Sequence, residues 1–80
     1  MAITILRIPT VVKRTGRSRS STYTDIADGT CVPPVRIGPR AIGFPEHEID
    51  ALNLARVAGK SNSEIRALVS RLVADRAKVV

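Results

Sequence analysis

The sequence predicts a small, mainly α-helical domain that carries one short β-hairpin. Its 80 residues leave room for a single domain. Helix start and stop residues bound four segments, and a proline- and glycine-rich stretch in the middle alternates with a period of two. Leu, Ile, Val and Phe make up 23 of the 80 residues, above the share of roughly 20% that is typical of disordered chains. The chain is therefore expected to fold, on a mainly aliphatic core.

The first predicted helix covers residues 9–15. An apolar segment over residues 3–8 leads into it, and Pro9 suits the first turn of a helix because its ring fixes the backbone there. Gly16 supplies the left-handed residue that commonly ends a helix. Val11 and Val12 are expected to face the core.

The second predicted helix covers residues 18–28, because the Ser18 hydroxyl can cap its first amides and Gly29 can end it. Two short helices joined by a glycine-containing turn indicate a helix-turn-helix, and a hairpin that only packs a small bundle fits the spacing equally well. The core-facing side is predicted to be Thr22, Tyr23 and Ile26, with Ala27 beside them. In a helix-turn-helix the start and outer face of the second helix meet base edges in the major groove. The residues predicted there are Arg17, Ser18, Arg19, Ser20, Ser21 and Thr24.

A β-hairpin is predicted over residues 35–44. Val35 and Ile37 flank Arg36 with the alternation of a strand, and Gly38-Pro39-Arg40 has the composition of a turn. With Arg36 facing outward and Arg40 at its tip, the hairpin is interpreted as a wing whose arginines contact DNA phosphates or enter the minor groove. The alternative is a flap that only covers the core.

Two further helices follow. One is predicted over residues 45–58, and the other begins with a Ser61–Glu64 capping box and runs to about Lys78. We predict a winged helix-turn-helix DNA-binding domain over residues 1–58 and an amphipathic helix within 59–80 that packs on it or serves self-association. The apolar stripe of that helix consists of Ile65, Leu68, Val69, Leu72 and Val73.

The charge is concentrated in the N-terminal half. Thirteen Lys and Arg against seven Asp and Glu give a net charge of +6, and residues 1–45 hold seven of the basic residues but only two acids. Such an excess is typical of proteins that bind nucleic acid, and a solvated basic surface explains it equally well. If the partner is DNA, these seven cations should converge on one side of the molecule.

Several classes of protein are disfavoured. Cys31 is the only cysteine, so no internal disulfide is expected. A structural zinc site needs four Cys or His ligands, and Cys31 and His47 supply only two. We predict neither a metal nor a cofactor. Cys31 with His47 could form a thiol–base pair, and Glu46 with Glu48 could form a carboxylate pair. The two glutamates are two positions apart on a helix and so do not face each other. We predict that the protein is not an enzyme. No apolar run approaches membrane-spanning length, and Arg7 interrupts the apolar start too early for a signal peptide. A cytoplasmic protein without membrane contact is therefore expected.

The residues also resemble a known family. The chain is similar to the AlpA family of phage and prophage regulators over about residues 3–58. The similar stretches are Ile5–Pro9, Thr15-Gly16, Ser18–Ser20, Tyr23, Ile26–Gly29 and, above all, Val35–Ala51. The resemblance implies a winged helix-turn-helix related to excisionases and to the DNA-binding part of MerR-type regulators. It also implies transcriptional regulation of prophage or genomic-island genes, in some members with excision through an integrase.

Some positions depart from the pattern of that family. Arg17, Thr22 and Asp25 stand where aliphatic residues are expected, and Thr24 stands where a basic residue is common. Cys31-Val32-Pro33 replaces an aromatic-proline-basic run, and Leu52 occupies a usual tryptophan position.

The leading hypothesis is therefore a sequence-specific regulator that binds double-stranded DNA, with a second copy of itself, an integrase or RNA polymerase as further partners. One alternative is an excisionase-type factor that bends DNA beside an integrase. Another is a protein-interaction module without DNA specificity, whose basic half meets an acidic protein or whose apolar stripe enters a partner groove.

Overall fold

Four helices and a three-stranded antiparallel sheet form the fold in a computed structural model, which describes residues 2–78. In chain order the elements are β1 (Ile5–Leu6), α1 (Ile8–Thr15), α2 (Arg19–Asp28), β2 (Val35–Gly38), β3 (Ala41–Pro45), α3 (Glu46–Val57), α4 (Asn62–Asp75) and a 3₁₀ turn (Arg76–Lys78).

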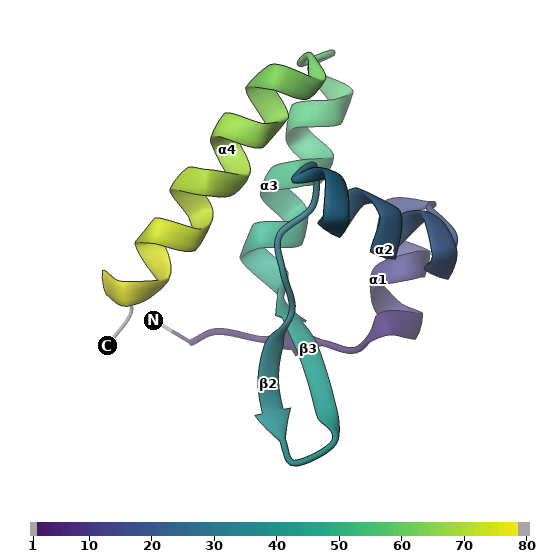
Figure 1. Ribbon diagram of the computed structural model, residues 1–80, viewed down its shortest axis with the longest axis vertical. Coiled ribbons are helices and arrows are strands. Elements are labelled where there is room, and N and C mark those ends of the chain that lie inside the picture. The colour runs from purple at the N-terminus through teal and green to yellow at the C-terminus, as the bar shows by residue number, and fades with distance from the viewer. Residues whose placement is uncertain (1, 79–80) are drawn as a thin grey trace.

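Helix α3 stands in the middle of the molecule (Figure 1). Helix α4 runs back along one side of it, and the α1–α2 pair lies on the other side. The β2–β3 hairpin projects from the end at which α3 begins. The fold is a winged helix-turn-helix, as the sequence predicts, with α1 and α2 as the two helices and β2–β3 as the wing.

The helix ends lie where local signals predict them. Gly16 and Gly29 both adopt the left-handed conformation, with φ of 73° and 81°. The Ser18 hydroxyl accepts a hydrogen bond of 3.1 Å from the backbone N–H of Ser21, so it caps α2. At the start of α4 both halves of the capping box between Ser61 and Glu64 are formed.

The apolar lead-in segment forms a strand that the sequence analysis did not predict. Strand β1 pairs with β3 through Ile5 opposite Pro45 and Leu6 opposite Phe44, so the sheet has the order β1-β3-β2. Two residues are too few to display a period of two, which explains why the pattern did not reveal the strand. A Cβ atom on Gly43 would collide with the Ile5 side chain, so a glycine is needed where β1 crosses β3.

The core joins all the helices to the sheet. Phe44, Ile49, Val11 and Val32 are fully buried at its centre. Its remaining buried apolar members include Leu52 and, from α4, Ile65 and Val69, with Leu68 and Leu72 packed against them. Most of the apolar stripe of α4 is thus covered by the same chain, and Val73 is the member that stays exposed.

The predicted inner face of α2 needs one correction. Thr22 is buried and Ile26 packs against the core, but the Tyr23 side chain is 41% exposed and Ala27 also faces solvent. Asp25 is buried in their place. Residues 22, 25 and 26 follow the i, i+3, i+4 spacing of a single helix face, so Tyr23 falls outside that face.

Candidate nucleic-acid interface

The exposed face of α2 carries polar side chains at its N-terminal end. Arg19, Ser20, Tyr23 and Thr24 are all exposed, and Ser18 precedes them as the helix cap. The Thr24 hydroxyl donates to the carbonyl oxygen of Ser20 at 3.1 Å, which leaves its oxygen free to accept. The Ser18 hydroxyl donates to Ser21 Oγ at 3.0 Å. These groups can supply both donors and acceptors to a ligand lying along the helix.

A surface groove of about 390 Å³ lies between this helix face, the start of α1 and the wing. Its rim holds one arginine from each of three segments, namely Arg7 before α1, Arg19 in α2 and Arg40 in the turn of the wing. Within residues 2–78 none of these three guanidinium groups lies within ion-pair distance of a carboxylate. The rest of the lining is Ile8, Pro9, Tyr23 and Ile42.

The second arginine of the wing, Arg36, lies on the side of the sheet that faces the groove. Arg36 is paired with Ile42 across the two strands. Side chains of directly opposed residues leave a sheet on the same face, and Ile42 lines the groove. The register therefore directs the exposed Arg36 side chain to the groove side of the wing.

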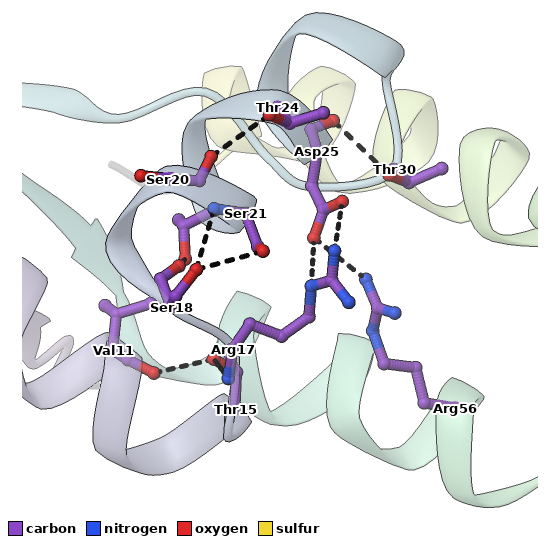
Figure 2. A network of polar contacts seen from close by, with 11 residues as sticks. Val11, Thr15, Arg17, Ser18, Ser20, Ser21, Thr24, Asp25, Thr30 and Arg56 are labelled. Atoms are coloured by element: carbon purple, nitrogen blue, oxygen red, sulfur yellow. Dashed lines mark hydrogen bonds and ion pairs between the residues drawn. The ribbon is translucent and has the colours of Figure 1, made fainter.

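Arg17 is placed differently from the other predicted residues. Its guanidinium forms an ion pair with the Asp25 carboxylate, in which Nη2 donates to Oδ1 at 3.0 Å and Nε lies 2.7 Å from Oδ2 (Figure 2). Arg56 from α3 approaches the same carboxylate, with Nη2 3.6 Å from Oδ2. The positive charge of Arg17 is thus balanced inside the protein.

The seven N-terminal cations therefore have different surroundings. Arg7, Arg19 and Arg40 meet at the groove, whereas Arg17 is bound to Asp25. Arg14 is bound to Glu46 at 2.7 Å and to Asp50 at 3.4 Å. Lys13 and Arg36 are exposed.

Two groove residues were missed by the sequence analysis. The sequence places Tyr23 on the inner face of α2, although its spacing of four from Arg19 puts the two on one helix face. Arg7 belongs to the basic excess of the N-terminal half. No local pattern links it to α2, since their proximity depends on how β1 and α1 pack.

Of the residues considered for catalysis, Cys31 and Glu48 are buried. Cys31 is buried, and desolvation, aided by the nearby Asp25 charge, raises the pKa of its thiol to about 11. Glu46 binds Arg14 at the surface, whereas Glu48 is buried against Arg76, so the two carboxylates belong to separate ion pairs. His47 is exposed.

Residues 2–78 contain neither a metal-binding cluster nor a membrane-spanning helix. No cluster of three or more His, Cys, Asp or Glu side chains there is arranged to hold a metal ion. None of the helices described there has the length and apolar character needed to cross a membrane.

The Cys31 thiol should be unreactive in the folded protein. With a pKa near 11 it is almost entirely protonated at pH 8, and the thiolate is the reactive form. We expect a chromogenic disulfide reagent at pH 8 to label the native chain at least about 100-fold more slowly than the urea-unfolded chain, because burial and protonation both slow the reaction. Equal rates would show that Cys31 is accessible.

A helix-turn-helix beside an arginine-bearing hairpin defines the class of winged DNA-binding domains. Residues 4–51 match the family model described as prophage CP4-57 regulatory protein (AlpA). This match spans more than half of the 80 residues, and the chain belongs to the AlpA family of prophage regulatory proteins. The match confirms the resemblance found in the sequence. No curated protein and no solved structure matches the chain.

Proposed function

We propose that the protein is a transcriptional regulator of prophage or genomic-island genes that binds double-stranded DNA at specific sequences. In this proposal the N-terminal half of α2 enters the major groove and the wing contacts the adjacent backbone. The observation that carries it is the groove between α2 and the wing, where three arginines meet that have no carboxylate partner among residues 2–78. Membership of a prophage regulatory family supports the same role.

The side chains divide by the contacts they can make. Arg19 on the exposed face of α2 has the planar fork that pairs with the O6 and N7 atoms of guanine. Ser20 and Thr24, one turn apart on that face, can accept or donate to neighbouring bases or phosphates. Arg36 and Arg40 on the wing are proposed to bind phosphates, which fixes orientation but reads no sequence. Ser18 acts as the cap that starts the helix.

Binding by such a surface should depend strongly on salt. Neutralising about four or five phosphates predicts a slope of roughly −4 in a plot of log K against log salt, because each contact releases about 0.9 counterion. We expect fluorescence anisotropy with a duplex selected from a random library to give this slope. A flat salt response would contradict the proposal and favour a protein-interaction module.

Two substitutions distinguish base recognition by Arg19 from phosphate binding by Arg40. Arg40→Ala should weaken binding to all duplexes alike and make the slope shallower by about 0.9. Arg19→Ala should instead reduce discrimination at one or two base pairs, by about 10- to 100-fold in affinity ratio. Arg71→Ala on α4 is the matched control, since it removes the same charge from an exposed position that does not line the groove. If both variants lose affinity equally for all duplexes, Arg19 does not read bases.

A single winged module buries only about 600–1,000 Å² on DNA, so a second copy or a neighbouring protein is expected to share the site. We propose that the protein works by binding alone, without catalysis, in the cytoplasm where its DNA lies. Circular-permutation gels on the selected duplex would test the excisionase alternative, because a strong bend centred on the site would favour a DNA-bending factor that acts with an integrase. An unbent complex would favour contact with RNA polymerase or simple occlusion of a promoter.

A further inference from the structure

The groove between α2 and the wing combines cationic and apolar surfaces. Its lining consists of three arginines, Arg7, Arg19 and Arg40, and of Ile8, Pro9, Ile42 and Tyr23. A surface meant only for solvated charge has no need of an apolar lining. A deoxyribose–phosphate chain has the same two parts, because each anionic phosphate alternates with a largely apolar sugar.

The position of the groove also fits a DNA backbone. If α2 occupies the major groove and the wing lies beside it, the element of duplex that passes between them is the backbone of one strand. Arg40 on the wing and Arg7 before α1 come from different segments of the chain, so they can approach that strand from different directions. Their guanidinium forks match phosphate oxygens.

We propose that this groove holds the sugar–phosphate backbone of one DNA strand, with Arg7 and Arg40 on phosphates and the Tyr23 ring against a deoxyribose. The inference rests on the proposed function and adds to it two contact residues, Arg7 and Tyr23. Arg19, one turn before Tyr23 on α2, lies where the groove meets the base-reading face.

Both new residues can be changed without disturbing the fold. Arg7 precedes α1 and its carbonyl oxygen accepts from the amides of Thr10 and Val11, but its side chain makes no capping hydrogen bond. Tyr23 is 41% exposed. Thermal melting of Arg7→Ala and Tyr23→Ala should therefore match that of the wild-type chain.

The test measures affinity and salt slope for the full chain on its selected duplex. Arg7→Ala should make the slope shallower by about 0.9 and weaken binding to all duplexes alike, and Arg7→Lys should restore the slope. Tyr23→Ala should lower the affinity about tenfold with an unchanged slope, because it removes an uncharged contact, while Tyr23→Phe keeps the ring and should stay within about twofold. Arg71→Ala again serves as the control.

The outcomes separate this inference from the proposed function. If wild type and the Arg19 and Arg40 variants behave as expected but Arg7→Ala keeps the full slope and Tyr23→Ala keeps the full affinity, the groove is not a backbone site although the protein still binds DNA. If Tyr23→Phe loses as much affinity as Tyr23→Ala, the hydroxyl rather than the ring makes the contact and the sugar-packing role is wrong. If the wild-type chain binds no duplex, the proposed function fails and this inference fails with it.

Discussion

Arg76→Ala should destabilise the folded protein by about 3–5 kcal/mol, because it leaves a buried carboxylate without its partner. Glu48 is fully buried, and Arg76 donates two hydrogen bonds to it, from Nη2 to Oε1 at 2.6 Å and from Nε to Oε2 at 2.9 Å. Arg76 Nη2 also donates to the carbonyl oxygen of Pro33 at 2.8 Å. A small domain has only about 5–15 kcal/mol of stability in total. Urea unfolding followed by circular dichroism should therefore show a large fall in the midpoint.

Lys78→Ala is the matched control for this measurement. Lys78 lies in the same 3₁₀ turn and pairs with Asp75 at 3.5 Å, but both side chains are largely exposed. Exposed pairs of this kind contribute only about 0–1 kcal/mol. If Arg76→Ala costs no more than Lys78→Ala, Glu48 does not depend on Arg76 for its burial. Replacing Glu48 and Arg76 together with methionine should recover most of the loss, since an apolar pair leaves no unpaired charge.

The Glu48–Arg76 pair bears on where the DNA-binding unit ends. Glu48 lies within the residues that match the AlpA family model, whereas Arg76 lies beyond them. Helix α4 also contributes Ile65 and Val69 to the common core. From the same helix, Arg66 Nε donates to the carbonyl oxygen of Asp28 at the end of α2, at 2.9 Å. Residues on both sides of position 58 thus stabilise one structure, and α4 supports the helix that is proposed to read DNA.

The parts of the fold that the sequence reveals are those set by neighbouring residues. Ser18 and Gly29 mark the ends of α2, and the Ser61–Glu64 box marks the start of α4, because each depends on hydrogen bonds or backbone conformation within a few positions. The turn between β2 and β3 is of the same kind. Such features require no knowledge of what packs against the element.

The parts that the sequence does not reveal depend on residues far apart in the chain. Strand β1 exists because β3, about 40 positions later, provides its hydrogen-bonding edge. The groove is formed by three separate segments. The number of basic residues therefore predicts that the groove is positively charged, but not which residues line it. The prediction that Tyr23 faces the core is wrong for a related reason. Asp25 occupies the inner face of α2 instead, and its burial requires the charge of Arg17.

That pair explains two departures from the AlpA pattern at once. Arg17 and Asp25 both stand where aliphatic residues are expected, and the structure shows that they are each other's partners, with the Asp25 side chain only 12% exposed. An unpaired carboxylate at position 25 would be costly to bury, whereas Arg17 neutralises it and Arg56 supports the pair from α3. We therefore expect Asp25 to be tolerated only where Arg17 accompanies it.

Asp25→Ala should cost about 2–3 kcal/mol of folding stability, less than a fully buried pair because the Arg17 side chain is 40% exposed and can regain water. Arg17→Leu should also destabilise, since it leaves Asp25 with Arg56 alone. The double variant Arg17→Leu, Asp25→Leu should return close to wild-type stability. A double-mutant cycle in urea, closed with Asp25→Leu as the second single variant, should therefore give a coupling of about 3 kcal/mol. Additive losses would show that the two positions are independent.

The same double variant tests how charge is distributed over the DNA-binding surface. Because Asp25 already balances Arg17, removing both residues leaves the net charge unchanged and leaves Arg7, Arg19 and Arg40 at the groove. We expect its salt slope to stay within about 0.3 of the wild-type value, against a change of about 0.9 for Arg40→Ala. A shift as large as that of Arg40→Ala would mean that Arg17 leaves Asp25 for a phosphate when DNA binds. In that event the ion pair would be exchanged during binding, and Arg17 would join the contact surface that its position at the start of α2 suggests.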